Sequence, residues 1–352
     1  MGKCFLKVSL KKSNMPSLNK VSILIVTYRG DGLLENCLNS LAAACGTEPQ
    51  VVVVDNSPSE STRAIVARFP NARYVASPGN PGFAGGNNRG LPYCDRKYLL
   101  LLNNDTVVQR RESIERLAEF LDENPKCAVA QGTMIMPQND DRLCPCGSVL
   151  TPFGFMHAKA AFRPRGEGPK SPYPCFSAIG AFMMVRRSAI AAAGRFLFRS
   201  HFWSYYEETD FCHRVWLSGN EVWFVPTEPI DHLCGTTSGM FPSDVIMGRY
   251  LRNQLFSLSS TLGFWSRKWL VPSQCCVVLA HGLLNLCMGK VAMFSADCGA
   301  IASLWRERAR ILAARRGVKR IRRVSDSSIF RKVMGLPPVG YMLRSLVAST
   351  RG

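Results

Sequence analysis

Three acidic residues, Glu207, Glu208 and Asp210, lie within four positions of one another at the expected start of a helix. A carboxylate in such a cluster can act as a general base that removes a proton from a hydroxyl group. Acidic side chains are also stabilised in the first turn of any helix by the helix dipole, so the spacing leaves a structural role open. The rings of Trp203 and Tyr206, which precede the cluster, suit either stacking on a sugar or core packing.

A second candidate site is Asn104-Asp105, which closes a predicted strand over 98–102. A carboxylate at a strand end that faces an anionic ligand is a natural ligand for Mg²⁺ or Mn²⁺, because these cations prefer oxygen donors. His232 is a candidate second ligand, since Mn²⁺ also tolerates imidazole. Taken alone, a histidine such as His232 is more often structural than a metal ligand.

The segment 80–88 reads NPGFAGGNN, and a helix is expected to begin nearby. Its glycines, Gly82, Gly85 and Gly86, allow the backbone to approach a ligand closely. The segment does not match Gly-x-Gly-x-x-Gly and follows the third strand, which argues against a nicotinamide-dependent dehydrogenase. Asp55 ends the second strand, where its carboxylate can accept hydrogen bonds from a ribose or a base, although Asp also favours turns.

The elements that position these residues are short apolar runs separated by helical patterns. Strands are expected over 21–27, 51–54, 73–76 and 98–102, and helices over 33–41, 59–68 and 113–123. This alternation predicts a parallel α/β sheet with right-handed crossovers. Ligands of such sheets bind beyond the carboxyl ends of the strands, where Thr27, Arg29, Asp55, Asn104 and Asp105 lie. Further strands are expected over 178–185 and 221–225, and a helix over 208–218.

The C-terminal part has a different character. The charge-free run 269–289 is 21 residues long, nominally enough to span a bilayer. Pro272 and His281 interrupt it, so we expect a buried or membrane-surface helix. The run 306–323 holds nine Arg or Lys and one Glu, which suits a phosphate-bearing surface, with a solvated helix face as the alternative.

Composition narrows the class of protein. The 352 residues include 44 Lys+Arg and 25 Asp+Glu, and the net charge of +19 indicates an anionic partner. The apolar fraction of 47% excludes wholesale disorder. There are 14 cysteines but no Cys-x-x-Cys pair, so we expect reduced thiols in a cytosolic protein, with metal binding or disulfide formation as the alternative. The first twenty residues are lysine-rich and lack the apolar core of a secretory signal.

Five ordered blocks resemble the inverting GT-A glycosyltransferases of family two, especially the rhamnosyltransferase-like branch. The blocks are VSILIVTYRG, VVVVDNSPSE, NPGFAGGNNRG, LLLLNNDT and YYEETDFCHR followed by SGNEVWFVP and DH, between Val21 and Ser238. The resemblance implies an α/β GT-A fold with a mostly parallel sheet flanked by helices. It also implies three parts: a basic tail over 1–20, a catalytic domain over 21–238, and a helical, basic and apolar C-terminal region over 239–352.

The resemblance also assigns roles to individual residues. Thr27, Arg29 and Asp55 would line the nucleotide pocket, and Asn80, Gly82, Asn88 and Asn104 would contact the nucleotide-sugar. Asp105 and His232 would bind the metal, Glu208 would be the catalytic base within the cluster of Glu207 and Asp210, and Trp203 and Tyr206 would meet the acceptor. Two departures from the family pattern stand out: Asn-Asn-Asp replaces the Asp-x-Asp motif, and Glu207-Glu208 replaces the usual Glu-Asp pair.

The implied reaction is one displacement with inversion. The donor would be a nucleoside diphosphate sugar, for which we expect dTDP-rhamnose, with UDP-hexoses and UDP-galactofuranose as open alternatives. Mg²⁺ or Mn²⁺ would neutralise the leaving group, and Glu208 would deprotonate a hydroxyl of a glycan or lipid-linked glycan in cell-envelope polysaccharide synthesis.

Two further classes remain as alternatives. The replaced acids leave room for a non-catalytic sugar-nucleotide or glycan-binding relative. Nucleic-acid binding is not expected, because the basic run 306–323 lacks interleaved aromatic residues. We expect a cytoplasmic protein that is peripheral to the anionic cytoplasmic face of the membrane.

Overall fold

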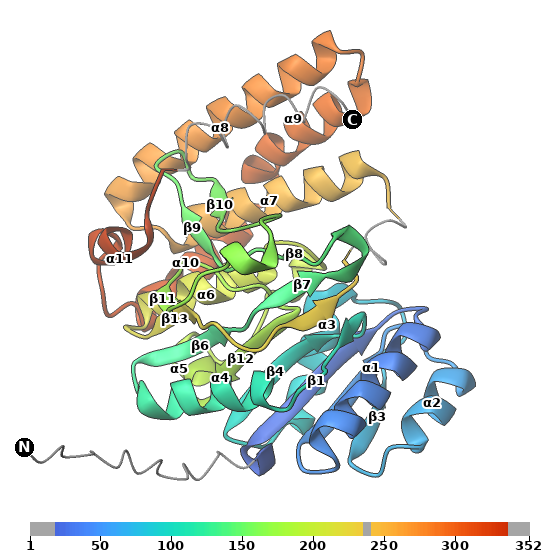
Figure 1. The fold of residues 1–352 in the computed structure, drawn as a ribbon. Helices are drawn as coiled ribbons and strands as arrows, with labels where there is room; N and C mark the ends of the chain where they lie inside the picture. Colours follow the sequence, from blue (N-terminus) through green and yellow to red (C-terminus); the bar gives the residue numbers. More distant parts are fainter. Residues whose placement is uncertain (1–17, 235–240, 337–352) are drawn as a thin grey trace, which may run out of the picture.

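A twisted eight-stranded sheet forms the centre of the protein, as the computed structural model of residues 18–234 and 241–336 shows (Figure 1). Its strand order is β11-β13-β6-β12-β4-β1-β2-β3. The strands are β1 (Val21–Thr27), β2 (Gln50–Asp55), β3 (Ala72–Ala76), β4 (Tyr98–Asn103), β6 (Cys127–Gln131), β11 (Tyr173–Pro174), β12 (Phe182–Arg186) and β13 (Glu221–Phe224).

The first half of this sheet is the parallel unit that the sequence predicts. β1 pairs in parallel with β2 and β4, and β2 pairs in parallel with β3. In this register Thr27 lies beside Asp55 and Val26 beside Asn103, so the polar strand ends reach one edge. β1, β2 and β4 are buried on both faces, which explains their nearly uninterrupted apolar sequences.

The second half adds antiparallel strands to the sheet, which is mostly parallel, as the family resemblance implies. β12 runs antiparallel to both β4 and β6, and β11 runs antiparallel to β13. The sheet is therefore mixed. The apolar sequence of the strand predicted over 178–185 indicates burial, but it carries no information about strand direction.

A four-stranded sheet of order β5-β14-β7-β8 adjoins the carboxyl edge. It consists of β5 (Thr106–Val107), β7 (Met134–Met136), β8 (Arg142–Leu143) and β14 (Ile230–His232). β14 pairs antiparallel with β5, with His232 opposite Thr106. This pairing brings His232 next to Asp105 although 127 positions separate them. A hairpin of β9 (Ser148–Leu150) and β10 (Met156–Ala158) lies nearby.

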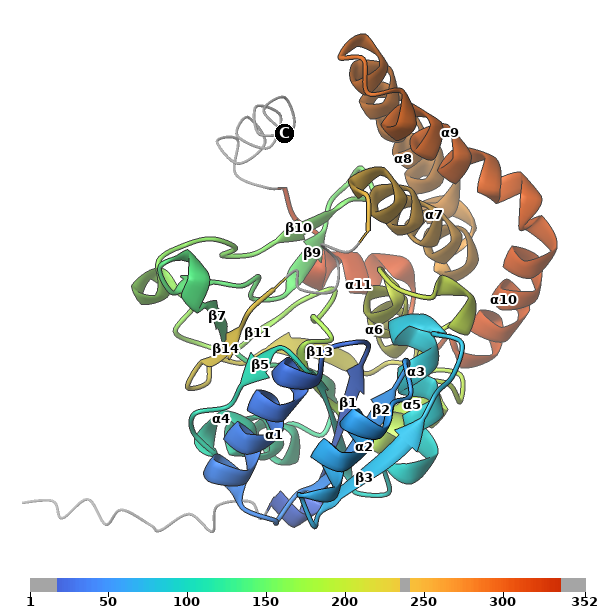
Figure 2. The same cartoon turned by 90° about the vertical axis from the view of Figure 1, so that its right-hand side faces the viewer.

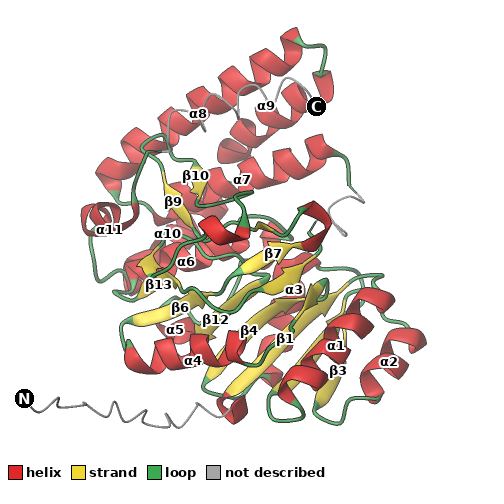
Figure 3. Cartoon of the chain, viewed as in Figure 1, coloured by secondary structure: helices red, strands yellow, loops and turns green. Residues whose placement is uncertain are grey.

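Helices cover both faces of the main sheet (Figure 3). One apolar layer involves α1 (Asp31–Cys45), α2 (Glu60–Ala67) and α4 (Glu112–Glu123). The other involves α3 (Gly82–Gly90), α5 (Arg187–Ala192) and α6 (Glu207–Leu217). The helices predicted in the first half and over 208–218 are confirmed to within a few residues at their ends.

The remaining helices form a C-terminal group, shown in gold to red in Figure 2. They are α7 (Ser243–Thr261), α8 (Phe264–Cys287), α9 (Val291–Arg306), α10 (Arg308–Ile321) and α11 (Asp326–Val333). α7 packs on α6, and α9 packs against both α7 and α8. Most of the predicted basic tail over 1–20 and the predicted boundary at 238 lie outside the described residues, so the division into domains stays a prediction.

Candidate active site

A cavity of about 290 Å³ opens at the carboxyl edge of β1 and β4, beside the first turn of α6. It brings together most of the polar residues that the sequence singles out. The predicted residues in its lining are Thr27, Asn80, Gly82, Asn104, Asp105, Trp203, Glu207, Glu208 and His232.

Two adjacent carboxyl groups face this cavity from the start of α6. No described residue offers a hydrogen bond to Oε2 of Glu207 or to Oε2 of Glu208. Burial raises the pKa of Glu208 to about 7. Burial and the neighbouring Glu208 raise the pKa of Glu207 well above its usual range. The helix dipole would favour the charged forms here, but desolvation outweighs it, so Glu208 can exchange a proton near neutral pH.

Asp105 and His232 form a second group on the same cavity. Oδ1 of Asp105 lies 3.3 Å from Nε2 of His232, and both side chains are largely buried. Burial lowers the pKa of His232, but Asp105 and Cys234 outweigh it and raise this pKa to about 9. A carboxylate oxygen and an imidazole nitrogen side by side are a donor set that fits Mn²⁺ or Mg²⁺ with further ligands from a bound phosphate.

Asparagines and one glycine shape the rest of the lining. Nδ2 of Asn104, the middle residue of the Asn-Asn-Asp motif, donates to Oγ1 of Thr27 at 3.0 Å and so links the ends of two neighbouring strands. The carbonyl of Asn80 accepts a hydrogen bond from the indole of Trp203 at 2.9 Å. Gly82 has a φ of 74°, and a Cβ there would collide with the backbone carbonyl of Trp203. Glycine at 82 therefore allows the close contact between α3 and the segment before α6.

The segment before α6 has a strained backbone. Trp203, Tyr205 and Tyr206 have positive φ values of 63°, 73° and 71°, which bulky residues rarely adopt. Nδ2 of Asn253 on α7 donates to the carbonyls of Phe202, Ser204 and Tyr205 at 3.0, 3.1 and 2.7 Å. α7 thereby holds the turn from which Trp203 and Glu208 enter the cavity.

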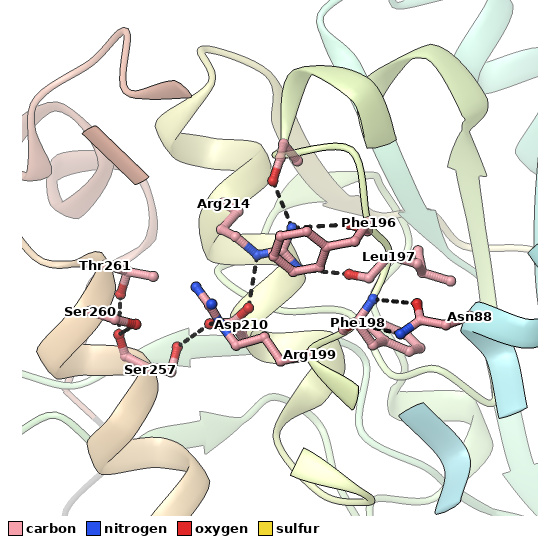
Figure 4. A network of polar contacts seen from close by, with 11 residues as sticks. Asn88, Phe196, Leu197, Phe198, Arg199, Asp210, Arg214, Ser257, Ser260 and Thr261 are labelled. Carbon is pink, nitrogen blue, oxygen red and sulfur yellow. Dashed lines mark hydrogen bonds and ion pairs between the residues drawn. The ribbon is translucent and has the colours of Figure 1, made fainter. Parts of the chain in front are cut away.

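The structure corrects the catalytic prediction for Asp210, which is fully buried and lies outside the cavity lining. Its oxygens accept hydrogen bonds from Nε of Arg199 at 2.9 Å and Nε of Arg214 at 2.8 Å (Figure 4). Burial raises the pKa of Asp210, but the two arginines outweigh it and hold this pKa well below its usual range. Residues two positions apart on a helix point about 200° apart, so Asp210 turns away from the face of Glu208.

Asn88 and Tyr206 are also corrected. The amide of Asn88 pairs with the backbone of Phe198, donating to its carbonyl at 2.7 Å and accepting from its N–H at 3.0 Å (Figure 4). Tyr206 is buried against Tyr250, with ring centroids 5.4 Å apart. Neither residue lines the cavity, so both stabilise the structure around the site.

Asp55 and Arg29 lie at the predicted strand ends but outside the cavity lining. Asp55 accepts hydrogen bonds from the N–H groups of Ser57 and Ser59 and from the Tyr74 hydroxyl. Arg29 is exposed, and its guanidinium lies 5.3 Å from the ring centroid of Tyr28. Their roles toward a nucleotide stay predictions.

Some lining residues were missed from the sequence. Asn56 follows Asp55, lines the cavity and donates to the carbonyl of Gly82 at 2.9 Å. Cys234 also lines the cavity, with its thiol 3.1 Å from Nδ1 of His232. Asn56 could have been predicted as a site residue, because it directly follows the end of β2. His-x-Cys at 232–234 was visible, but its partner Cys144 is distant in sequence.

The comparisons with known proteins agree with this geometry. Residues 22–193 match the family model described as glycosyl transferase family 2. A low-salt glycan biosynthesis hexosyltransferase of Haloferax volcanii is 27% identical over 214 residues, which cover 58% of this chain and 64% of the relative. An N-acetylglucosaminyl-diphospho-decaprenol L-rhamnosyltransferase of Mycobacterium tuberculosis is 26% identical over 270 residues, which cover 69% of this chain and 85% of the relative.

A solved structure supports the fold. The mannosyltransferase of Pyrobaculum calidifontis, in complex with GDP-Man and Mn²⁺, superposes with a TM-score of 0.51 at 13% identity, covering 86% of this chain and 84% of the neighbour. At this identity the likeness concerns the fold alone, and that fold is GT-A-like. The family match runs from β1 to α5, so residues 22–193 of the chain are assigned to glycosyl transferase family 2.

Proposed function

We propose that the protein is a metal-dependent, inverting hexosyltransferase that uses Glu208 as its catalytic base. The observation that carries the proposal is that Glu208 and the Asp105–His232 pair line one cavity. A sugar transfer with inversion needs one proton acceptor and one region that tolerates the negative charge of a leaving diphosphate. The cavity offers one group of each kind.

In this proposal Glu208 accepts the proton of an acceptor hydroxyl as that oxygen attacks the anomeric carbon. A base works best when its pKa lies near the working pH, and burial raises the pKa of Glu208 to about 7. Asp105 and His232 would hold Mg²⁺ or Mn²⁺. When bound, the cation neutralises the charge that develops on the leaving diphosphate. Trp203 would pack against the sugar or acceptor from the strained turn.

The donor is proposed to be dTDP-rhamnose, and the acceptor a hydroxyl of a glycan or lipid-linked glycan. The support is the likeness to the mycobacterial L-rhamnosyltransferase, which acts on a diphospho-decaprenol according to its name. The other relative is a hexosyltransferase of glycan biosynthesis, and the solved neighbour binds GDP-Man. UDP-hexoses, UDP-galactofuranose and GDP-mannose therefore belong in the donor panel.

The direct test is the rate of nucleotide release with Glu208→Gln. We expect the rate to fall by about 10²–10⁴-fold, because the amide cannot accept the proton. Glu112→Gln, at the start of α4 and away from the cavity, is the control. An unchanged rate in Glu208→Gln would remove Glu208 as the base. Donor-dependent thermal stabilisation without nucleotide release by the parent protein would favour the non-catalytic alternative.

A second part of the proposal concerns the membrane. One helix among the described residues, α8, has the length and composition to cross a bilayer, and only 28% of its apolar window is buried. Six exposed apolar side chains of α8 follow helical spacing on one stripe: Trp265, Trp269, Cys276, Leu279, Leu283 and Leu286. Phe264, Val277 and Leu284 are exposed on either side of it.

α8 lies in the helical layer farthest from the main sheet (Figure 1). α10 adds a run of arginines and lysines, among them the exposed Arg308 and Arg316. An apolar stripe and a cationic helix in the same C-terminal group suit binding to an anionic interface, where both contributions add. We therefore place the enzyme at the surface where a lipid-linked acceptor resides.

Co-sedimentation tests this placement. We expect binding to anionic vesicles that weakens with salt and with the double substitution Trp265→Ser and Trp269→Ser. Neutral vesicles are the control. Salt-sensitive binding to a DNA duplex without binding to vesicles would overturn the membrane proposal in favour of nucleic-acid binding.

A further inference from the structure

Behind the cavity, three soft ligand atoms from distant parts of the sequence converge. Sγ of Cys144 lies 3.6 Å from Sγ of Cys234, and Nδ1 of His232 lies 3.8 Å from the first sulfur and 3.1 Å from the second. Among the residues that the structure describes, this is the one group of three or more histidine, cysteine and acidic side chains whose ligand atoms are close enough to share a cation.

From this arrangement we infer that Cys144, His232 and Cys234 form a binding site for a soft divalent cation, Zn²⁺ being the best match. Zn–S bonds of about 2.3 Å and Zn–N bonds of about 2.0 Å at tetrahedral angles place two sulfurs about 3.8 Å apart, and a sulfur and a nitrogen about 3.5 Å apart. The three observed distances differ from these values by at most about 0.4 Å. The sulfurs are also too far apart for a disulfide bond, which is about 2.0 Å long.

Asp105 supplies the hydrogen-bond partner that a metal-bound histidine usually has at its second ring nitrogen. The other ring nitrogen of His232, Nε2, faces Oδ1 of Asp105 at 3.3 Å. A carboxylate that accepts from the second nitrogen fixes the tautomer of a metal-bound imidazole. His232 and Cys234 line the cavity, so a cation can enter and its fourth coordination position would face the cavity.

The fold explains why these ligands meet. The strand order of the small sheet is β5-β14-β7-β8, so β14 and β8 both pair with β7. His232 ends β14, Cys234 follows two positions later, and Cys144 comes directly after β8. The backbone N–H of Cys144 donates to the carbonyl of Met134 on β7 at 3.0 Å, which fixes its place.

The site shares its imidazole with the donor-side cation, and this consequence rests on the proposed function. A neutral imidazole has one nitrogen lone pair to offer a metal. Zn²⁺ on Nδ1 therefore leaves Nε2 as an N–H group that donates to Asp105 and cannot bind Mn²⁺. Occupation of the sulfur site would weaken Mn²⁺ binding on the cavity side and reduce transfer.

Cobalt spectroscopy tests the site on the full chain after treatment with a reductant and a chelator. We expect one equivalent of Co²⁺ to give thiolate-to-cobalt charge-transfer absorption, which Zn²⁺ removes by displacement. The absorption should be lost in Cys144→Ser and in Cys234→Ser. It should persist in Cys276→Ser, an exposed thiol on α8, and in Cys146→Ser, a buried thiol two positions from Cys144.

A measurement on the parent protein covers the case in which the serine variants do not fold. Zn²⁺ should protect Cys234 from alkylation while Cys276 is still labelled, as peptide mass analysis would report. Absence of the charge-transfer absorption together with equal labelling of Cys234 with and without Zn²⁺ would overturn the inference. A Cys144–Cys234 disulfide whose reduction restores no metal binding would overturn it as well.

The competition has its own readout, the amount of free Mn²⁺ measured by electron paramagnetic resonance in the presence of nucleotide. We expect Zn²⁺ to weaken Mn²⁺ binding by about tenfold or more in the parent protein and to have no effect in the Cys144→Ser, Cys234→Ser double variant. Equal weakening in both would overturn the competition. A parent protein that never binds Mn²⁺ contradicts the proposed function, while the cobalt spectrum still tests the sulfur site.

Discussion

Two carboxyl groups in the first turn of α6, on opposite faces of the helix, have pKa values shifted in opposite directions. Glu208 faces the cavity, no described residue offers its Oε2 a hydrogen bond, and burial raises its pKa to about 7. Asp210 faces the interior and is ionised between Arg199 and Arg214. Both groups feel the same helix dipole, so the difference comes from their partners. A cluster of acids at a helix start thus divides into a reactive group and a structural one.

We expect the largest loss of stability from a substitution of the buried Asp210. Asp210→Asn leaves two buried guanidinium groups without their counter-ion, and removing one partner of a buried ion pair costs about 3–5 kcal/mol of unfolding free energy. Denaturant titration measures the loss. The half-exposed Asp122, which pairs with Lys97, is the control, and Asp122→Asn should cost about 1 kcal/mol or less. Equal losses in the two variants would show that the network around Asp210 is not decisive for stability.

Glu208→Gln tests the difference between Glu208 and Asp210 through the pH dependence of the unfolding free energy. The pKa of Glu208 is about 7 in the folded protein and about 4.5 in the unfolded chain. The folded state binds more protons between these values, so this group lowers the unfolding free energy as pH rises from 4.5 to 7, by up to about 3 kcal/mol. Gln has no proton to lose, so the variant should become more stable than the parent across this window.

Chemical unfolding at a series of pH values is the measurement. Asp210 acts in the opposite sense: its folded-state pKa is depressed, so its stabilisation is present at neutral pH and is lost as pH falls below the usual range of aspartate. A constant difference between the parent protein and Glu208→Gln from pH 4.5 to 7 would contradict the account of Glu208.

α7 contacts both the turn before α6 and the buried face of α6. Asn253 donates to carbonyls of the turn, and Ser257, one helical turn later, donates to Asp210. Asn253→Ala removes three hydrogen bonds to the carbonyls of the strained turn. Buried carbonyls without partners should cost about 1–3 kcal/mol of stability. The turn positions Trp203 and Glu208, so we expect kcat to fall more than donor affinity, as steady-state kinetics and thermal shift would report. A change in stability with kcat and KM unchanged would reduce Asn253 to a purely structural residue.

The fold was predictable to the extent that local patterns determine it. The strand 21–27 and its parallel neighbours are apolar runs ended by polar or glycine residues, so their bounds and their shared edge follow from sequence. The direction of β12 could not be predicted, because the apolar sequence of a buried strand is compatible with either parallel or antiparallel pairing. Thr27, Asn104 and Asp105 were predicted from their strand ends and His232 from the family resemblance, and all four line the same cavity.

The errors concern residues whose partners are distant in sequence. Asn88 pairs with Phe198, 110 positions away, and Cys144 meets Cys234, 90 positions away. Nothing near either residue indicates these contacts. For Asp210 the helical spacing was available, and a strict reading of the 200° separation would have placed it away from Glu208. The contact with Arg199 could not be predicted from the sequence. Its guanidinium donates a hydrogen bond to Asp210 and helps to keep that carboxylate in the interior.

The smallest expected effect is that of Ser257→Ala, which removes one of the three hydrogen bonds to Asp210. Oγ of Ser257 donates to Oδ1 of Asp210 at 3.0 Å, an atom that also accepts from Arg199. Because both arginines remain, the charge stays compensated, and the loss should be about 1 kcal/mol, far below that of Asp210→Asn. The rate of nucleotide release should not change, since Ser257 lies outside the cavity lining. A fall in that rate as large as that of Glu208→Gln would mean that the two faces of α6 are coupled, and the division between a reactive and a structural carboxyl group would fail.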